Sequence, residues 1–140
     1  MAKKTNPRPK PVKSRNGGTM TEAAFFGRLR SMLRRSSMWW EPIKQAEKLA
    51  RRPNQSDNPR LKWEYQCAEC KEWFKGSEVQ VDHIVPCGSL TSLEDIPRFI
   101  ENLLSENVDD YQVLCKEHHQ EKTNAERDKR KAKKEVANAA

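Results

Sequence analysis

Residues 63–74 read WEYQCAECKEWF, and this stretch carries the first half of a metal-binding pattern. Cys67 and Cys70 are separated by two residues, a spacing that lets two thiolates converge on one tetrahedral ion. Redox-active cysteine pairs share this spacing, so the pair alone leaves both interpretations open. A second pair of ligands is needed to choose between them.

That second pair lies in residues 114–123, LCKEHHQEKT, where Cys115 and His118 repeat the two-residue spacing. The whole chain has only four cysteines and three histidines, so a chance arrangement of two such pairs is a poor explanation. We therefore predict that Cys67, Cys70, Cys115 and His118 bind one structural zinc ion, whose four protein ligands leave no open position for chemistry.

The remaining cysteine, Cys87, follows Pro86 and has no spaced partner, so we predict a small buried side chain and not a ligand. The N-terminus lacks the apolar stretch of a secretory signal, and no apolar run approaches the length of a membrane span. We expect a cytoplasmic protein with no membrane partner. In that reducing compartment cysteines are metal ligands or free thiols more often than disulfides.

Between the two halves of the metal-binding pattern lies EVQVDHIVP, residues 78–86. Its apolar residues alternate with Gln80 and Asp82, as in a short strand that Pro86 ends. Neighbouring strand side chains point to opposite sides, so Asp82 and His83 can have separate roles. A carboxylate there can hold a divalent cation, and an imidazole can accept a proton near neutral pH. An ordinary surface or turn feature is the alternative for such a pair.

A second strand is predicted over residues 111–114, followed by a helix over residues 116–134. His119 lies next to the zinc ligand His118 and is rotated from it around the helix by about a third of a turn. If His118 faces the zinc, His119 can face the two strands. One strand pair and one helix would then bring Asp82, His83 and His119 together.

We divide the chain into four zones: a disordered basic arm over 1–18, a helical extension over 19–60, a central domain over 61–126 and a basic tail over 127–140. We predict one helix over residues 19–35, with Thr19 and Glu22 as a capping box, and another over 41–52, with Pro42 in its first turn. Within 87–109, an apolar stripe predicts a short helix that accepts Pro97 near its beginning. Four tryptophans could stack on bases, but packing is the preferred interpretation for each: Trp39, Trp40, Trp63 and Trp73.

Charge is unevenly distributed along the chain. Residues 1–60 hold 15 Lys and Arg against 4 acidic residues, and residues 61–110 hold 4 against 11. Basic flanks around an acidic middle fit a protein whose flanks hold a polyanion while its carboxylates hold a cation, although basic tails can also serve solubility alone. The hydrophobic and charged fractions are 35% and 34%, so the apolar core must be small, and a small core usually needs help from a metal or from disulfides.

In combination these motifs resemble the HNH endonuclease family, and especially its compact zinc-containing members encoded by bacteriophages. The resemblance covers about residues 63–125. It rests on the first Cys pair, on VDHIVP over residues 81–86, on YQVLC over residues 111–115, and on His119 followed by Lys122 and Thr123. It implies an α+β fold in which a ββα-metal unit, stapled by the structural zinc, is flanked by N-terminal helices and a basic C-terminal helix.

The resemblance also implies roles for site residues. His83 would be the general base, while Asp82 and His119 would bind one catalytic Mg²⁺ or Mn²⁺. DNA, contacted mainly through backbone phosphates, would be cut to leave 5′-phosphate ends. A phage origin would place the protein in the host cytoplasm, with partners in phage DNA metabolism.

Two departures from the family pattern concern His118 and Asp110. The family usually has a cysteine where this chain has His118, and imidazole is also a good zinc ligand. The family's central Asn is here Asp110, which when ionised can accept hydrogen bonds in the loop but cannot donate them. The rival hypothesis is therefore a non-catalytic zinc-dependent DNA-binding module on the same scaffold. A purely structural assembly protein is a third hypothesis, and only the basic arm and the basic tail support it.

Overall fold

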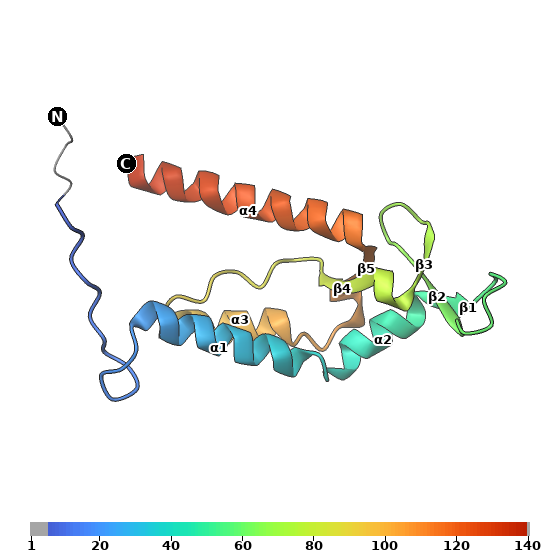
Figure 1. Ribbon diagram of the computed structural model, residues 1–140, viewed down its shortest axis with the longest axis horizontal. Coiled ribbons are helices and arrows are strands. Elements are labelled where there is room, and N and C mark those ends of the chain that lie inside the picture. The colour runs from blue at the N-terminus through green and yellow to red at the C-terminus, as the bar shows by residue number, and fades with distance from the viewer. Residues whose placement is uncertain (1–5, 140) are drawn as a thin grey trace.

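The computed structural model describes residues 6–139 of the chain. Figure 1 shows a small mixed fold of helices and two antiparallel sheets, one between helices and the other at the right end of the molecule. The helices are α1 (Glu22–Ser37), α2 (Glu41–Leu49), α3 (Ile96–Leu103) and α4 (Lys116–Ala139). The strands are β1 (Arg51–Pro53), β2 (Trp63–Gln66), β3 (Trp73–Lys75), β4 (Val79–His83) and β5 (Tyr111–Cys115). This mixed helix and strand content is compatible with the predicted α+β class.

The pairing of β4 with β5 positions most of the residues singled out in the sequence. The two strands are antiparallel, with Val79 opposite Cys115 and His83 opposite Tyr111. α4 begins directly after β5. The elements β4, β5 and α4 are therefore neighbours in space, although residues 84–110 separate the two strands in sequence. The second sheet has the order β1-β2-β3 and supplies the first Cys pair.

Two predicted helix boundaries were wrong, in both cases because neighbouring residues make other hydrogen bonds. α1 begins at Glu22 and not at residue 19, since Thr21 caps it by accepting from the Ala24 N–H at 3.2 Å. Thr19 belongs to the preceding turn, where its hydroxyl donates to the Asn16 carbonyl at 2.8 Å. This turn contains Gly17 and Gly18 at positive φ, which glycine adopts without steric cost.

α2 ends at Leu49 because the next residues pair with β2 and do not continue the helix. Arg52 lies opposite Glu64 in the sheet, and the Ala50 carbonyl accepts from the Gln66 N–H at 2.9 Å. Pro42 lies in the first turn of α2, as predicted. Of the predicted basic arm, residues 6–14 have exposed side chains without regular secondary structure, and residues 1–5 lie outside the described residues.

The larger apolar core lies between α1, α3 and the segment that precedes α3. Its fully buried members are Phe26, Cys87, Leu90, Phe99 and Leu103. The prediction that Cys87 is a small buried side chain is thus confirmed, and burial raises the pKa of its thiol. The predicted short helix is α3, with Pro97 in its first turn. Burying a side chain as large as Phe99 contributes about 1.5–3 kcal/mol.

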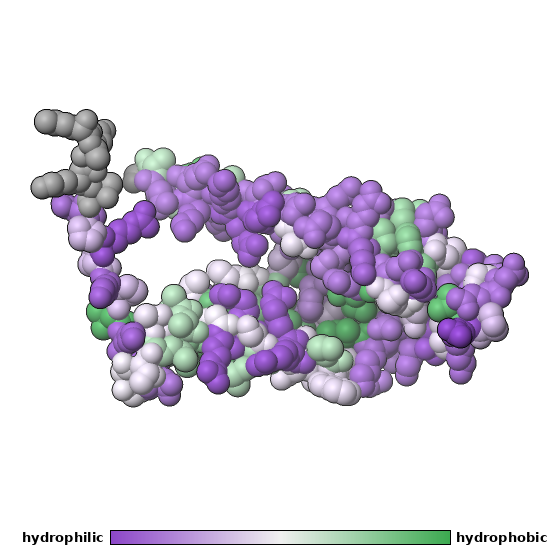
Figure 2. Space-filling view, in the orientation of Figure 1, coloured by the Kyte–Doolittle hydropathy of each residue, from purple (hydrophilic) through white to green (hydrophobic). Residues whose placement is uncertain are grey.

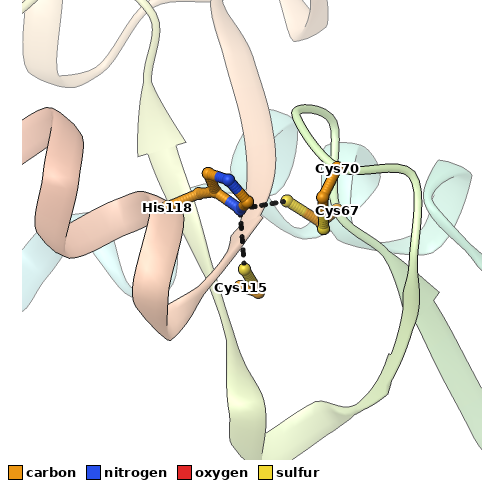
Figure 3. A group of neighbouring side chains, drawn as sticks. All are labelled: Cys67, Cys70, Cys115 and His118. Carbon is orange, nitrogen blue, oxygen red and sulfur yellow. Dashed lines mark hydrogen bonds between the residues drawn. The ribbon is translucent and has the colours of Figure 1, made fainter.

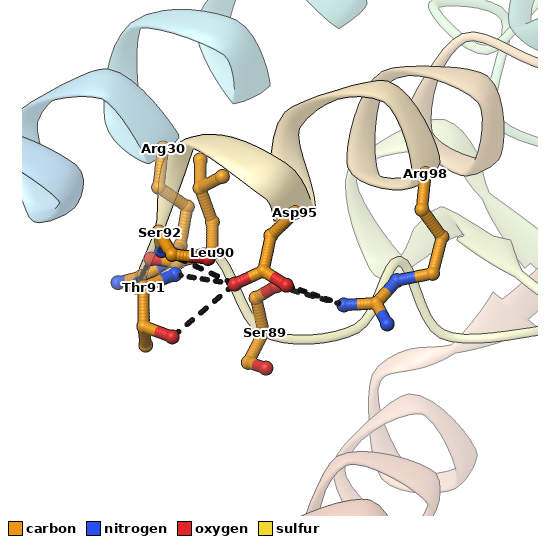
Figure 4. A network of polar contacts seen from close by, with 7 residues as sticks. All are labelled: Arg30, Ser89, Leu90, Thr91, Ser92, Asp95 and Arg98. Atoms are coloured by element: carbon orange, nitrogen blue, oxygen red, sulfur yellow. Dashed lines mark hydrogen bonds and ion pairs between the residues drawn. The ribbon is translucent and has the colours of Figure 1, made fainter.

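A polar network fastens residues 84–95 against this core (Figure 4). Arg30 of α1 donates to the Leu90 carbonyl at 3.1 Å, and Arg98 of α3 donates to the Ser89 carbonyl at 3.2 Å. The Asp95 carboxylate accepts from the Thr91 N–H at 3.1 Å and from the Ser92 N–H at 3.2 Å. These backbone donors, with that of Thr91 the strongest, lower the pKa of Asp95. The network lets Leu90 be fully buried at the end of a loop.

α4 extends well beyond the body that holds its first turns. It has 24 residues, about 36 Å at 1.5 Å per residue, and none of them is fully buried. Figure 2 shows open space between the C-terminal half of α4 and the part of the molecule formed by α1. Its exposed residues include six cations: Arg127, Lys129, Arg130, Lys131, Lys133 and Lys134. Among residues 6–139, no helix combines the length and apolar character that crossing a membrane requires.

The four tryptophans do not all pack, contrary to the prediction. Trp40 donates its indole N–H to the Ser105 carbonyl at 2.9 Å. Trp63 and Trp73 lie under guanidinium groups, with Arg51 and Arg52 at 4.0 and 3.7 Å from the respective ring centroids. Trp39, in contrast, is 78% exposed. Packing therefore does not account for Trp39.

Candidate metal centre and its polar neighbour

The four predicted zinc ligands converge from three parts of the fold (Figure 3). Cys67 and Cys70 belong to the turn between β2 and β3, Cys115 ends β5, and His118 lies in the first turn of α4. Their ligand atoms all lie within 4.8 Å of one another. The predicted grouping of these four residues is confirmed, and together they could hold a zinc ion.

The turn that carries the first Cys pair is shaped by backbone hydrogen bonds. The Cys67 carbonyl accepts from the Lys71 N–H at 3.0 Å, and the Cys67 N–H donates to the Glu72 carbonyl at 3.0 Å. Lys71 has φ +63°, which lets the chain reverse directly after Cys70. The Ala68 N–H donates to the Val113 carbonyl at 2.8 Å, so the turn is fixed to β5 beside the second ligand pair.

The donor set and its geometry fit zinc. His118 Nδ1 lies 3.1 Å from Cys115 Sγ and 3.8 Å from Cys67 Sγ. Two ligands of one tetrahedral zinc ion lie about 3.5–3.8 Å apart, given Zn–S and Zn–N distances of about 2.3 and 2.0 Å. Cys67 is fully buried and Cys115 is 3% exposed, whereas Cys70 and His118 are half-buried, so the cluster lies at the edge of the core. His118 Nε2 lies 3.9 Å from Glu121, a carboxylate that can orient the imidazole.

The two thiols of the first pair differ in their readiness to ionise. Burial opposes ionisation of Cys67, but backbone N–H groups of Cys115, Cys70 and Glu69 outweigh it and lower the Cys67 pKa to about 6. At Cys70 the backbone N–H of Glu72 favours the thiolate, yet burial and the neighbouring Cys67 sulfur prevail and raise the pKa. A thiolate is the form that binds metal, so Cys67 is prepared for ligation by its backbone surroundings.

A second polar cluster is centred on Asp82. Gln112, opposite it on β5, donates to Asp82 Oδ2 at 3.1 Å, and the Lys122 ammonium lies 3.0 Å from the same oxygen. His119 Nε2 lies 3.9 Å from Asp82 Oδ1. The carboxylate therefore has one oxygen bound to protein donors and the other directed toward an imidazole.

His83 lies on the same strand but points to a different environment. Its Nε2 lies 2.8 Å from the Leu103 carbonyl, and its ring packs edge-on against Tyr111 with centroids 5.0 Å apart. A carbonyl can only accept, so Nε2 carries the proton and the lone pair of the neutral imidazole is on Nδ1. The alternation of strand side chains thus separates His83 from Asp82 and His119, as expected for two distinct roles.

Asp110 holds the loop next to His83 in place. Its backbone carbonyl accepts from the Ile84 N–H at 3.0 Å, and its carboxylate accepts from the Ser105 hydroxyl. The Tyr111 hydroxyl donates to the carbonyls of Ser105 and Leu103 at 2.9 and 3.3 Å. Burial is the main reason that the pKa of Tyr111 is raised to about 12, so it stays a donor. Asp110 therefore acts on His83 through the loop and not by direct contact.

Lys122 is a residue to which the sequence assigned no role. Its ammonium donates to the His83 carbonyl at 2.8 Å and also contacts the carboxylates of Asp82 and Glu126. Burial alone would lower the pKa of Lys122, but the hydrogen bonds to Glu126 and Asp82 outweigh it and raise the pKa. The available signal was its position three residues after His119, which places both side chains on one face of α4.

The structure thus brings Asp82, His119 and Lys122 together and holds His83 and Asp110 beside them. Within residues 6–139, the Cys67–His118 cluster is the one group of three or more potential ligands close enough to share a metal. Asp82 and His119 form only a pair, so a catalytic metal does not follow from the ligand geometry alone. Comparisons of the chain with protein-family models, curated proteins and solved structures found no match.

Proposed function

We propose that the protein is a metal-dependent DNA endonuclease with a ββα unit of the HNH type. The observation that carries the proposal is the arrangement at β4: Asp82 faces His119 of α4, while His83 on the other side of the strand keeps an unprotonated Nδ1. Phosphodiester hydrolysis needs a group that activates water and a group that offsets charge on the leaving oxygen. The two sides of β4 can supply one each.

Asp82 and His119 would hold the catalytic cation. Adjacent ligands of an octahedral Mg²⁺ ion at about 2.1 Å lie about 3.0 Å apart, so Asp82 Oδ1 and His119 Nε2, which are 3.9 Å apart, would have to approach each other to bind one ion. When bound, such an ion supplies Lewis-acid stabilisation of the phosphate and of the departing 3′-oxygen, leaving a 5′-phosphate. Lys122 and Gln112 hold the other carboxylate oxygen and so orient Asp82 toward His119.

His83 would act as the general base. Its Nδ1 accepts the proton of the attacking water, while the Nε2–H keeps its hydrogen bond to the Leu103 carbonyl. That bond fixes the ring and its tautomer, and it stabilises the positive charge that the imidazole gains. The edge-on contact with Tyr111 removes the remaining freedom of the ring. The imidazole is therefore oriented before substrate binds.

Basic segments on both sides of the unit would hold the DNA. The exposed cations in the C-terminal half of α4 and the net positive charge of residues 1–60 suit contacts with backbone phosphates. The zinc would have no part in the chemistry, because its ligands leave no open position. Its role would be to fix the start of α4, and with it His119, against β5.

A non-catalytic DNA-binding module on the same scaffold is the second candidate. The observation that favours it is the Lys122 ammonium at 3.0 Å from Asp82, which already neutralises the carboxylate. The replacement of the family's Asn by Asp110 points the same way. In this case the basic segments would bind DNA and no cleavage would follow.

A plasmid-cleavage assay separates the two candidates. Wild type is incubated with supercoiled DNA with and without Mg²⁺ or Mn²⁺, beside Asp82→Asn and the matched control Asp109→Asn. Asp109 is exposed and its carboxylate has no contact with the cluster, so this variant should cut as wild type does. Asp82→Asn should lose metal-dependent cleavage. No cleavage by wild type with either metal, or equal cleavage by Asp82→Asn, would reject the nuclease.

A further inference from the structure

Two adjoining hollows run along the outward side of α1. One, of about 330 Å³, is lined by Met32, Arg35, Ser36 and Trp39. The other, of about 420 Å³, has Met32 in common with the first and is also lined by Phe25, Arg28 and Leu29. Figure 2 shows hydrophobic side chains among hydrophilic ones over this part of the molecule. Because the hollows meet at Met32, they form one continuous groove, called the α1 groove below.

The exposed end of the α1 groove is unusually apolar for a surface. Trp39 is 78% exposed and the adjacent Met38 is 71% exposed. The other three tryptophans are engaged by a hydrogen bond or a guanidinium group, whereas the one cation over the Trp39 ring within residues 6–139 is the Lys44 ammonium, at 5.4 Å from the ring centroid. An exposed aromatic ring beside a hollow offers a face on which another ring can stack.

The rim of the α1 groove is basic. Arg28 and Arg35 are exposed, and neither forms an ion pair within the described part of the chain. They are seven residues apart, which is close to two helical turns or about 10.5 Å along α1. One hollow therefore combines the exposed Trp39 ring with the Arg35 guanidinium, and Arg28 adds a second cation at the other. The Phe25 ring, which also lines the second hollow, is covered by the Arg15 guanidinium at 4.5 Å from its centroid.

We propose that the α1 groove binds a single-stranded segment of DNA. Proteins bind single strands by combining cations that follow the phosphates with aromatic rings on which bases stack, and a nucleotide offers both groups in one repeating unit. Bases in a duplex have their faces covered by their neighbours, so Trp39 could not stack on them. An acidic amphipathic helix would also match the basic rim, but it does not carry the flat ring next to an anion that the neighbouring Trp39 and Arg35 match.

This binding would give the proposed nuclease a preference for DNA that contains unpaired nucleotides. The inference rests on the proposed function only for the choice of DNA among polyanions. It does not involve Asp82, His83 or His119, so binding can be measured where no cleavage occurs. It also gives a function to the exposed Trp39 ring, which packing does not explain.

The test measures fluorescence anisotropy of a labelled oligothymidylate of about 15 nucleotides, without added Mg²⁺ or Mn²⁺. Trp39→Ala should weaken binding on the order of tenfold, the loss of one stacked base, while Trp39→Tyr should keep most of it. Arg35→Gln should weaken binding and lower the salt slope by about one. Lys48→Gln, an exposed cation on α2, is the matched control and should change affinity by less than about twofold.

Unchanged binding by Trp39→Ala would overturn the inference, as would an equal loss of duplex binding in that variant. Competition by an acidic amphipathic peptide that depends on Trp39, without oligothymidylate binding, would overturn it in favour of a protein partner. Trp39 is exposed, so the variants should fold, and zinc content and circular dichroism check this. Cleavage without single-strand binding rejects the α1 groove alone, and single-strand binding without cleavage rejects the nuclease alone.

Discussion

The molecule has two small cores that are held together by different means. The core between α1 and α3 is apolar and includes Phe26, Leu90 and Phe99. The core under β2 and β5 contains Cys67, Cys115 and Leu114 and is built around four metal ligands. Apolar packing is always present, whereas the second core would depend on the zinc ion that its four ligands could hold. The stability of the two regions should therefore respond to different perturbations.

The proposed catalytic residues lie where the two cores meet. His119 is attached to the metal-dependent side through α4, and His83 is attached to the apolar side through the Leu103 carbonyl at the end of α3. Geometry at the site thus depends on both cores at once. Each of the predictions below changes one side while the other is observed.

The largest effect is expected from removing the zinc. Purified protein should contain about one equivalent, and Cys67→Ser or a chelator should unfold the region of β2, β5 and α4, because structural zinc supplies about 10–16 kcal/mol of apparent binding free energy. Metal analysis and hydrogen exchange measure both effects. Cys87→Ser, in the apolar core, is the control and should keep its zinc. A well-folded zinc-free wild type would contradict the assignment.

Phe99→Ala should affect the opposite core. The substitution removes a fully buried ring and should cost about 3–5 kcal/mol of unfolding free energy. Zinc content at low temperature should stay near one equivalent, since no ligand contacts Phe99. Thermal unfolding followed by circular dichroism and by zinc release gives the two stabilities. If both signals shift together by the same amount, the two regions form one cooperative unit and the contrast drawn above is wrong.

His83→Ala should act on the junction of the two cores without damaging either. We expect cleavage to fall about 10²–10⁴-fold, the usual effect of losing a positioned base, with fold, zinc and DNA affinity nearly intact. Asp82→Ala and His119→Ala should instead weaken metal binding, so a higher Mn²⁺ concentration should partly restore the cleavage rate of these two variants. Initial rates over a range of Mn²⁺ concentrations distinguish these cases. An active His83→Ala enzyme would remove the general base from the mechanism.

Deletion of residues 1–18 should act mainly on DNA binding, although it also removes Arg15, which stacks on the Phe25 and Phe26 rings at the edge of the apolar core. The segment contributes six of the 15 cations in residues 1–60, and each phosphate contact releases counterions. The plot of log affinity against log salt should therefore become less steep. An unchanged slope would mean that this segment does not contact DNA, and the contacts would then be sought on α1 and α4.

The smallest effect concerns pH and is confined to the apolar side. Asp95 has a folded pKa lowered from 3.8, so its ionised form stabilises the loop before α3 above that value. This contribution should disappear as pH falls through the lowered folded pKa. The melting temperature of wild type should therefore decrease more than that of Asp95→Asn on going below about pH 4. Parallel curves for the two proteins would show that Asp95 contributes nothing measurable.

Features encoded locally could be predicted from the sequence. The two-residue spacings placed all four zinc ligands, and alternation in residues 79–83 placed β4 with Asp82 and His83 on opposite sides. The apolar stripe that includes Phe99 gave α3. In each case the pattern itself lies within a few residues, although the two ligand pairs that it places are separated by residues 71–114.

Features that depend on distant partners could not be predicted. Arg51 and Arg52 continue a helical pattern in the sequence, but in the structure they form strand β1 and pair with β2. The acceptor for His83 comes from Leu103, twenty positions away, and nothing in the intervening sequence specifies that contact. Trp39 is a large aromatic residue of the kind that usually packs in a core. It follows the end of α1 at Ser37 and is exposed there.

The Leu103 carbonyl has a consequence for how the chain can change in length. The last carbonyls of a helix need partners, and here the side chains of His83 and Tyr111 provide them for α3. Residues added between Val85 and Pro86 would lengthen an exposed connection that precedes the buried Cys87, and would leave α3 where it is. Residues added between Leu103 and Asp110 would shift the end of α3 relative to β5 and rotate the imidazole. Evolution can therefore lengthen the segment before α3 far more freely than the segment after it.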